Sequence, residues 1–410
     1  MSRVVVIGGG ASGLVAAIQA AKNNNNKVTL IEKNNNLGKK ILVTGNGKCN
    51  YWNKDISIEH YNTKDNDILE QILTKENKLE IESFFDKIGI VPKIKDGLYY
   101  PNSNQATSIQ TALILETQLQ GVEIITNEEV LSLTKDNNKF IIETTNQKMI
   151  ANKVIISTGS KACPKTGSDG LGYELATSLG HSIIKPLPAL VQLKANTPFL
   201  KEWQGIRVDA EVSLYEDNKL LKQEIGEVQL TNYGISGVCI FQLSSLVSRG
   251  LYNNKKEQIK INFLKSININ NEQEFINWIE KRNNIVKNRN ISELLDGVLN
   301  YKLINLILKL TKIPREYLLK DISTSKKEEL GLNLTKFKLD IIDTNSFDNA
   351  QTCTGGIPLN EINPNTMESI KQKNLYITGE LLDADGECGG FNLGFAWITG
   401  YLAGTGVNND

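Results

Sequence analysis

The 410-residue sequence contains only two histidines, His60 and His181, and five cysteines. Two histidines nearly exclude a histidine-based catalytic triad and a site in which several histidines hold a metal ion. The cysteines form no C-x-x-C pair, which excludes the common zinc motifs, and their odd number indicates a reducing compartment. We therefore expect no metal site.

The sequence also lacks long hydrophobic runs and an excess of charge of either sign. No apolar run approaches the roughly 20 residues that cross a membrane, and an apolar strand that begins at Arg3 leaves no room for a secretory leader. Basic and acidic residues number 46 each, so no net charge attracts nucleic acid or an anionic membrane. We expect a cytoplasmic protein with a small-molecule partner and with no nucleic-acid or membrane partner. Its oligomeric state stays open.

An apolar run at residues 4–7 is followed directly by a G-x-G-x-x-G pattern made by Gly8, Gly10 and Gly13. This order predicts a buried parallel strand, a tight turn, and a helix whose N-terminus holds phosphate. Gly8 permits the sharp turn, Gly10 lets the backbone approach a pyrophosphate, and Gly13 lets helix and strand pack closely. The pattern indicates a dinucleotide site.

The second strand of this unit, residues 28–32, ends in an acidic residue, Glu32, nineteen positions after Gly13. A carboxylate at the tip of this strand accepts hydrogen bonds from the 2′-hydroxyl of an adenosine ribose. This acceptor favours FAD or NAD over NADP. The choice between FAD and NAD stays open on these residues alone.

Apolar periodicity and turn residues predict the elements that follow. Residues 67–89 show the spacing of one helix that ends at Gly89, and a second helix is expected at about 105–119. Short strands are expected at 122–125, 130–134, 140–144 and 154–156. We interpret these strands as a small antiparallel insert that returns to the parallel sheet.

From residue 187 the sequence changes to alternating strands, clearest at 208–214 and 258–263, and then to helices over about 272–330. Near residue 345 it returns to glycine-rich sequence, with a last strand at 374–380 and a last helix at 392–404. We expect residues 187–344 to be an insertion. The first domain is then discontinuous, with residues 1–186 and 345–410.

Two further glycine motifs follow predicted strands. Thr158-Gly159 and Gly379-Glu380 are turns of the kind that bring backbone close to a dinucleotide, and Gly389-Gly390 opens a helix. In a flavoprotein that helix N-terminus can face N1 and C2=O of the isoalloxazine, where negative charge accumulates on reduction. The acidic stretch 383–387 is similar to a calcium loop, but Gly394 occupies the position of the bidentate glutamate.

Several longer motifs together resemble the bacterial BaiN-like (YhiN-like) flavoproteins, a family of NAD(P)/FAD-dependent oxidoreductases that includes aminoacetone oxidases. The resemblance covers essentially the whole chain. It rests on Gly8-Gly-Gly-Ala-Ser-Gly13, Gly45-Asn-Gly-Lys-Cys-Asn50, Tyr100-Pro-Asn-Ser-Asn-Gln-Ala106, Thr352-Cys-Thr-Gly-Gly356, Asn365-Thr-Met-Glu-Ser369 and residues 379–392. It implies an α/β fold in which a Rossmann-type FAD domain with a parallel sheet is interrupted by a β-barrel (about 187–265) and a helical subdomain (about 266–335).

The resemblance also implies which residues hold the FAD. The pyrophosphate is expected at Gly8, Gly10, Ala11, Ser12 and Gly13, and the adenosine end at Glu32, Lys33 and Val130. Thr158 and Gly159 are expected to follow Val130 along the cofactor. The flavin side is expected at Lys40, Thr44, Gly45, Asn46, Cys49, Asn50, Gly379, Glu380, Asn392, Leu393 and Gly394. The family usually has arginine where this chain has Lys48, which keeps the charge and loses the bidentate geometry.

These patterns favour an FAD oxidoreductase that transfers a hydride between flavin N5 and a small organic substrate held between the FAD domain and the insert. Residues 167–172 lack the strand–turn–helix spacing of a second nucleotide motif, so either NAD(P)H binds only transiently or another molecule supplies the electrons. Alternatives are an amine oxidase that uses oxygen and a non-catalytic flavin sensor whose insert binds a partner. Cys49 and Cys388 lie in motifs expected near the flavin. Two roles stay open for them, a redox pair that exchanges electrons with FAD and small residues that pack in the core. No residue is assigned as the acid or base.

Overall fold

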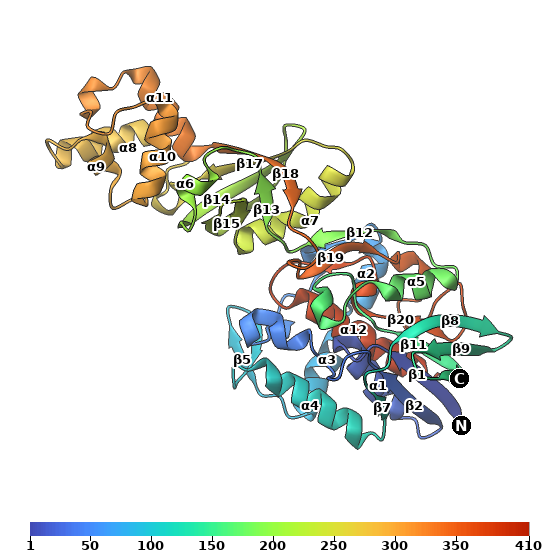
Figure 1. Ribbon diagram of the computed structural model, residues 1–410. Coiled ribbons are helices and arrows are strands. Elements are labelled where there is room, and N and C mark those ends of the chain that lie inside the picture. Colours follow the sequence, from blue (N-terminus) through green and yellow to red (C-terminus); the bar gives the residue numbers. More distant parts are fainter. Residues whose placement is uncertain (410) are drawn as a thin grey trace. The chain divides into compact units, whose positions relative to one another are not determined.

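A computed structural model describes residues 1–409. They form two compact units, each with its own hydrophobic core (Figure 1). Unit 1 consists of Met1–Pro188 and the chain from Phe347 onward, and unit 2 is Ala189–Ser346. The two units are described separately below.

Unit 1 is built on a five-stranded parallel sheet. Its strand order is β20 (Leu375–Ile377), β11 (Lys153–Ile156), β1 (Ser2–Ile7), β2 (Asn26–Ile31) and β7 (Glu123–Ile125). The α/β fold predicted from the sequence is therefore present. The placement of residues 122–125 in an antiparallel insert was wrong, because β7 pairs in parallel with the edge of β2.

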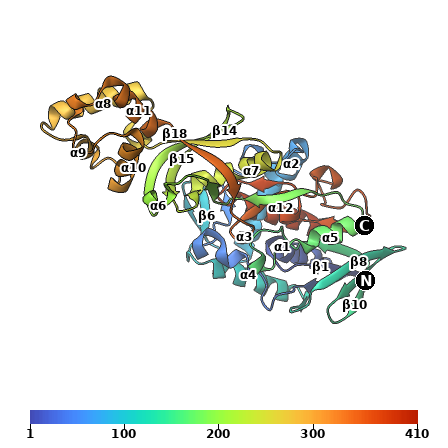
Figure 2. The same ribbon diagram turned by 45° about the horizontal axis from the view of Figure 1, so that its top comes forward.

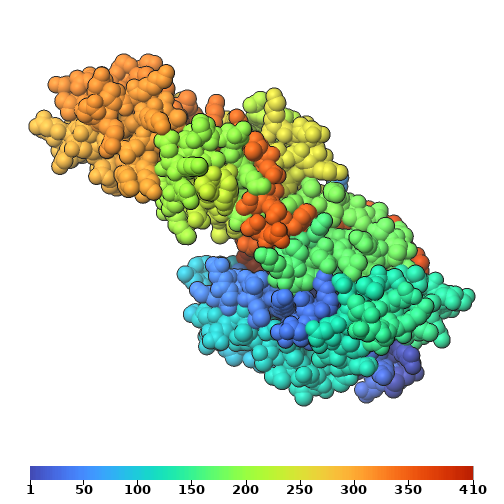
Figure 3. All heavy atoms as spheres, viewed as in Figure 1, coloured from blue at the N-terminus to red at the C-terminus, as the bar shows by residue number. Residues whose placement is uncertain are grey.

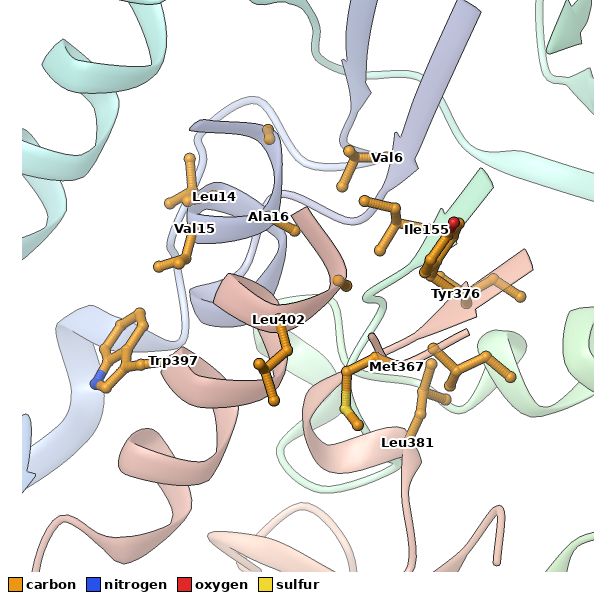
Figure 4. Close-up of a cluster of buried hydrophobic side chains, with 14 of the residues drawn as sticks. Val6, Leu14, Val15, Ala16, Ile155, Met367, Tyr376, Leu381, Trp397 and Leu402 are labelled. Carbon is orange, nitrogen blue, oxygen red and sulfur yellow. The ribbon is translucent and has the colours of Figure 1, made fainter. Parts of the chain in front are cut away.

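Two helices far apart in the sequence pack against each other beside this sheet. They are α1 (Ala11–Ala21) and α12 (Phe391–Gly406), and α12 confirms the helix predicted at 392–404. A Cβ on Gly400 would lie 2.3 Å from the carbonyl oxygen of Ser12, and a Cβ on Gly404 would lie 2.4 Å from that of Ala16. Figure 4 shows Leu14 and Val15 on one helix and Trp397 and Leu402 on the other. The small residues let the backbones approach closely.

The single helix predicted at 67–89 is two helices, α2 (Asn66–Ile72) and α3 (Lys75–Lys87). The break has a local cause, because the hydroxyl of Thr74 accepts a hydrogen bond from the backbone N–H of Asn77 at 3.2 Å and caps α3. Gly89, with a φ of +85°, follows the end of α3. The other helix predicted in this part is present as α4 (Ala106–Leu119).

Short strands complete unit 1 in small sheets. An antiparallel sheet contains β8 (Val130–Asp136), β9 (Lys139–Thr144) and β10 (Lys148–Ala151), which confirms the strands expected at 130–134 and 140–144. The remaining elements are β3 (Trp52–Asn53) with β6 (Leu98–Pro101) and β5 (Pro92–Lys95), β4 (Tyr61–Asn62) with β21 (Asp385–Gly386), β12 (Ile184–Ala189) with β19 (Thr352–Gly356), and the helix α5 (Leu171–Ser178).

Unit 2 contains a closed six-stranded barrel and a group of helices (Figure 2). The barrel order is β13 (Leu193–Ala195), β16 (Gly234–Ser236), β15 (Lys219–Leu230), β14 (Arg207–Glu216), β17 (Glu257–Asn262) and β18 (Phe337–Thr344). The helices are α6 (Leu200–Trp203), α7 (Val238–Tyr252), α8 (Glu272–Ile285), α9 (Ile291–Leu295), α10 (Tyr301–Thr311) and α11 (Thr324–Thr335). The barrel and the helical region implied by the resemblance are both present.

Within residues 1–409, the helices are too short or too polar to cross a membrane.

Candidate functional site

The turn between β1 and α1 gives its three glycines different surroundings. Gly8 has a φ of +102°, and a Cβ there would lie 2.6 Å from the carbonyl oxygen of Ser157. A Cβ on Gly13 would lie 1.9 Å from the Gly8 carbonyl oxygen. At Gly10, chain neighbours aside, no heavy atom of residues 1–409 lies within 4 Å of the Cβ position. The turn is therefore crowded at both ends and open at Gly10, where a phosphate can approach the backbone.

The N-terminus of α1 meets the C-terminal part of the chain. Gly10 is the N-cap, so no side chain caps the first N–H groups of the helix. In its first turn, the Ser12 hydroxyl oxygen lies 2.7 Å from the Cβ position of Gly379. Gly379 is held in turn by a hydrogen bond from its N–H to the Thr399 hydroxyl at 3.0 Å. The phosphate-binding turn predicted from the first residues and the Gly379-Glu380 turn are thus in contact.

Glu32 lies at the end of β2 and is buried. One carboxylate oxygen accepts a hydrogen bond from the Gly9 N–H at 2.8 Å, and the other accepts one from the Asn34 N–H at 2.8 Å. These bonds fix the carboxylate beside the glycine turn. The Asn34 side-chain nitrogen also donates to the second oxygen at 2.6 Å, so the oxygen bonded to Gly9 is the one that keeps acceptor capacity for a ribose hydroxyl. Next to it the Lys33 ammonium pairs with Asp169 and lies 3.9 Å from Glu129.

A shallow pocket, open to solvent, lies over Glu32 at the carboxyl ends of β1 and β2. This edge of a parallel sheet is where such folds bind nucleotides. The pocket brings together five predicted site residues, Gly8, Glu32, Lys33, Val130 and Thr158. The other residues that line it are Ile7, Ile31, Glu128, Glu129, Gly167, Asp169, Leu171 and Leu175.

The glycine-rich loop predicted to line the flavin side is a distorted 3-10 helix, Ile41–Gly47. Gly45 and Asn46 both take left-handed backbone conformations, with φ values of +54° and +53°. The Thr44 hydroxyl donates a hydrogen bond to the Ile41 carbonyl at 2.7 Å, and the Thr44 carbonyl accepts one from the Cys49 N–H at 3.1 Å. The loop is exposed at Gly45 and Asn46, and Figure 3 shows blue atoms of the N-terminal part of the chain at a hollow in this surface.

An ion pair connects the start of this loop to the short 3-10 helix Gly379–Leu381, which follows the strand β20. The Lys40 ammonium lies 2.6 Å from a Glu380 carboxylate oxygen, which also accepts a hydrogen bond from the Ser160 hydroxyl at 2.9 Å. Both side chains of the pair are largely buried, at 24% and 19% exposure. Gly159, directly before Ser160, has a φ of +76°. A Cβ on Gly159 would lie 2.7 Å from the Ser168 hydroxyl oxygen. Two predicted site residues, Lys40 and Glu380, are thus paired directly, and a third, Gly159, precedes the Ser160 that bonds to Glu380.

Gly389 and Gly390 lead into α12 with φ values of +130° and +91°, and Gly390 is the N-cap without a side-chain cap. Asn392, predicted to meet the flavin, uses its side chain elsewhere. Its oxygen accepts a hydrogen bond from the Gly386 N–H at 2.9 Å and its nitrogen donates to the Gly386 carbonyl at 2.7 Å. Gly394 is buried, and its Cβ position lies 2.5 Å from an Ile56 methyl group. Leu393 is half-buried beside the core of unit 1.

The buried polar atoms without a hydrogen-bond partner within residues 1–409 include Asn50 Oδ1 and Thr158 Oγ1, which lie near these turns. Asn50 Oδ1 lies 3.1 Å from the Cβ position of Gly390, at the N-terminus of α12. Thr158 lies in the wall of the pocket over Glu32. A buried polar atom without a partner is costly unless a ligand or water satisfies it. The open Gly10 and these two atoms therefore fit an extended dinucleotide that contacts both regions.

All five cysteines lie within residues 1–409, and each is a free thiol. Burial raises the pKa of the Cys49 thiol to about 11, so this thiol stays protonated at neutral pH. Because the thiolate is the reactive form, Cys49 is a packing residue and a poor member of a redox pair. Cys388 is half-buried in the turn before α12.

The two histidines take different environments. His181 is buried, with Nδ1 2.7 Å from Glu361 and Nε2 2.8 Å from the Ser369 hydroxyl. The serine, histidine and carboxylate are ordered as in a catalytic triad, an arrangement that the sequence had nearly excluded. Ser369 is itself buried and accepts hydrogen bonds from the N–H groups of Lys371 and Gln372, so it caps a turn. Across residues 1–409, no cluster of three or more histidine, cysteine, aspartate or glutamate residues could hold a metal ion.

Sequence reasoning missed several residues of this site. Ser157 donates hydrogen bonds to the Ile7 and Gly8 carbonyls, both at 2.9 Å, and so holds the glycine turn. Asp169 pairs with Lys33 across 136 positions, although it belongs to the glycine motif at 167–172. His60 contacts the segment before α12 through Glu387 at 2.8 Å. No local pattern connects these pairs.

Comparisons with known proteins agree with this geometry. The chain matches the family described as HI0933-like protein Rossmann domain over residues 2–406. It is 39% identical over 377 residues to 3-dehydro-bile acid delta(4,6)-reductase of Clostridium scindens, covering 92% of this chain and 91% of that protein. It is 26% identical over 377 residues to ribosomal RNA dihydrouridine synthase of Escherichia coli, covering 91% and 90%.

Among solved structures, the open conformation of a flavocytochrome c3 fumarate reductase superposes with a TM-score of 0.49 at 14% identity, covering 99% of this chain and 78% of that one. The family match spans both parts of unit 1 and all of unit 2, and it includes the glycine turn and the C-terminal helix. The chain is a member of the HI0933-like Rossmann family.

Proposed function

We propose that the chain is an FAD-dependent oxidoreductase. The observation that carries the proposal is the pairing of an open phosphate turn at Gly10 with a ribose acceptor at Glu32, in a chain 39% identical to a reductase over nearly its whole length. The adenosine would lie over Glu32 and Val130, and the pyrophosphate at the N-terminus of α1. Lys40, the loop at 44–50 and the N-terminus of α12 would hold the flavin end. When bound, the flavin supplies hydride transfer at N5.

The proposed reaction is the saturation of a carbon–carbon double bond conjugated to a carbonyl in a small molecule. Two of the curated relatives are named for the saturation of a double bond beside a carbonyl, one in a small molecule and one in RNA. A delta(4,6)-reductase of a 3-dehydro-bile acid saturates a bond in conjugation with the 3-keto group, and dihydrouridine is uridine with its C5–C6 bond saturated next to a carbonyl. A polarised double bond accepts hydride readily, so one flavin site can serve different substrates of this class. Neither protein's substrate is assigned to this chain.

The electron donor in this proposal is a nicotinamide cofactor that binds only transiently. Support comes from the motif at 167–172, which follows a 3-10 turn at Pro164–Thr166 and leads into α5. A stable dinucleotide motif follows a strand directly, and this motif does not. A transient donor reduces the flavin and leaves, after which the substrate enters.

The test is anaerobic mixing of the purified protein with NADH or NADPH while the flavin absorbance is recorded. Bleaching followed by recovery on addition of a 3-oxo-4,6-diene bile acid supports the proposal. Failure of both nicotinamides, with peroxide formed from amines in air, would favour an amine oxidase. Loss of colour without any turnover across conjugated carbonyl compounds would favour a flavin sensor. Denaturation should release FAD, and release of NAD alone would refute the cofactor assignment.

A second candidate is reduction of uridine in RNA. The observation that favours it is the 26% identity to ribosomal RNA dihydrouridine synthase of Escherichia coli, which covers 91% of this chain. The charges of the helical part of unit 2 do not select for RNA, because residues 272–335 contain eleven basic and nine acidic residues. The test is incubation of the reduced protein with a ribosomal RNA transcript and mass spectrometry for uridine heavier by two hydrogens.

A further inference from the structure

Residues 160–170, here called the strap, follow the turn at the end of β11 and lead into α5. The strap includes the first four residues of the glycine motif at 167–172. The Ser168 hydroxyl donates a hydrogen bond to the Ser160 carbonyl at 2.7 Å, and both serines are buried. The two ends of the strap are therefore held together.

The strap contacts the segment that follows β2 at three places. The Lys33 ammonium pairs with the Asp169 carboxylate. The Asn34 side-chain nitrogen donates a hydrogen bond to the Thr166 carbonyl at 3.2 Å, and a Cβ on Gly167 would lie 2.3 Å from the same nitrogen. These contacts set the strap against the carboxyl end of β2, where the expected ribose acceptor lies.

The strap and the end of β2 both line the pocket over Glu32. Gly167 and Asp169 line it from the strap, and Glu32 and Lys33 line it from the end of β2. A molecule that fills this pocket contacts both segments. The Lys33–Asp169 pair ties these two segments together, so we expect it to affect how firmly such a molecule is held.

Carboxylates surround the cation of this pocket. Within residues 1–409, Lys33 is the one basic residue in the pocket lining, beside Glu32, Glu128, Glu129 and Asp169. Lys33 pairs with Asp169 and lies 3.9 Å from Glu129, so carboxylates already balance its charge. These charges suit a ribose that donates hydroxyl groups, and they disfavour a ribose that carries a phosphate.

The contact between Lys33 and Asp169 is an ion pair at neutral pH. Burial opposes the charge of Asp169, but hydrogen bonds from Lys33 and from the Leu171 N–H outweigh it and lower the pKa of Asp169. The side chains of the pair are 22% and 42% exposed, so solvent screens it only in part. Neither residue belongs to a helix or strand, so the pair can open without breaking a regular element.

We propose that Asp169 holds Lys33 in an ion pair that fixes the strap against the adenosine end of FAD and excludes an adenosine with a 2′-phosphate. This inference rests on the proposed function and deepens it, and both residues are positioning residues. In nucleotide sites of this fold, a basic residue near the end of the second strand accommodates a ribose 2′-phosphate. Here Asp169 engages that basic residue. While FAD is bound, the strap belongs to its pocket, so a nicotinamide has no stable site there.

The first test measures the binding of two nucleotides to the apoproteins by titration calorimetry. The probes are ADP, which has a free 2′-hydroxyl, and adenosine 2′,5′-bisphosphate, which has a 2′-phosphate. Asp169→Asn should bind ADP about 10-fold more weakly, because the strap is no longer held. It should bind the bisphosphate at least as tightly as the wild type does, because Lys33 is free to meet the phosphate. Lys33→Met should weaken ADP binding similarly and gain nothing for the bisphosphate.

Two further variants separate this role from a general effect of charge. Lys33→Arg keeps the cation and should retain most of the ADP affinity. Lys27→Met is the matched control, because Lys27 lies on the same strand β2 and its ammonium is 3.8 Å from Glu123 in an exposed pair outside the pocket. It should leave the binding of both nucleotides unchanged. An Asp169→Asn variant with the wild-type preference between the two nucleotides would overturn the proposal.

The second test measures the release of FAD after dilution of the loaded protein, with flavin fluorescence recorded over time. Release should be about 10-fold faster from Asp169→Asn and Lys33→Met than from the wild type. Added salt should speed release from the wild type more than from either variant, because it screens the ion pair. A wild-type apoprotein that binds neither FAD nor ADP would refute the proposed function. FAD binding with equal release rates in all three proteins would refute this inference alone.

Discussion

Gly10 and Gly13 provide a matched pair of substitutions that separates ligand binding from folding. Both belong to the same turn, yet the Cβ position at Gly10 is open whereas that at Gly13 lies 1.9 Å from the Gly8 carbonyl oxygen. The backbone at Gly10, with φ of −82° and ψ of −162°, is accessible to alanine. Gly10→Ala should therefore affect the phosphate, and Gly13→Ala should affect the fold.

The structure sets the size of each effect. For Gly10→Ala, the loss of conformational freedom in the unfolded chain and the poorer N-cap oppose each other, so the apoprotein should change by less than about 1 kcal/mol. Displacing the phosphate costs about one charge-assisted hydrogen bond, which weakens FAD binding by roughly 10- to 100-fold. For Gly13→Ala, a Cβ needs at least 3.0 Å from its neighbours, and α1 cannot retreat because Gly400 packs against Ser12. We expect a destabilisation of about 2–3 kcal/mol.

The assays are urea unfolding of the apoproteins and fluorescence titration with FAD. The reasoning is refuted if Gly10→Ala binds FAD as tightly as the wild type, or if the Gly13→Ala apoprotein is as stable as the wild type. A Gly10→Ala apoprotein destabilised as strongly as Gly13→Ala would show that the open space at Gly10 is needed for folding.

Three further predictions concern charged groups. Burial, with Glu216 nearby, raises the pKa of buried Glu257 to about 7. The contribution of Glu257 to stability is therefore present below about pH 4.5 and is lost as pH rises through 7. In unfolding experiments from pH 5 to 8, Glu257→Gln should remove this loss, which is on the order of 3 kcal/mol. Burial lowers the pKa of His181, so the wild type should lose stability as pH falls below about 6.5, and a His181→Gln variant with the same slope against pH would contradict this. Lys40→Met should destabilise the protein by about 1–3 kcal/mol, because it leaves Glu380 without its cation. Adding Glu380→Gln to this variant should recover part of the loss. Strictly additive effects in the double-mutant cycle would argue against the ion pair.

The sequence predicted those parts of the site in which neighbouring residues determine the structure. The roles of Gly8 and Gly13 follow from a turn of six residues, and the structure confirms the crowding at both positions. The position of Glu32 follows from the length of one strand–helix–strand unit.

Predictions that depended on a longer stretch were less accurate. The helix at 67–89 has continuous apolar periodicity, but the cap at Thr74 divides it. Strand β7 was assigned to the wrong sheet, because a three-residue strand carries no signal for its partner. The side chain of Asn392 closes its own loop onto Gly386, a contact that the sequence did not predict, and the expected contact of Asn392 with the flavin stays a prediction.

The sequence by itself determined the phosphate turn, the acidic end of the second strand and the α/β class, because each depends on the spacing of residues within about thirty positions. Only the tertiary structure decided that Ser12 meets Gly379, that Lys40 pairs with Glu380, and that His60 lies against Glu387. These contacts join residues more than 300 positions apart. They form because the parallel sheet and the packing of α12 on α1 bring the two ends of the chain together, and no local pattern records which distant side chains then meet.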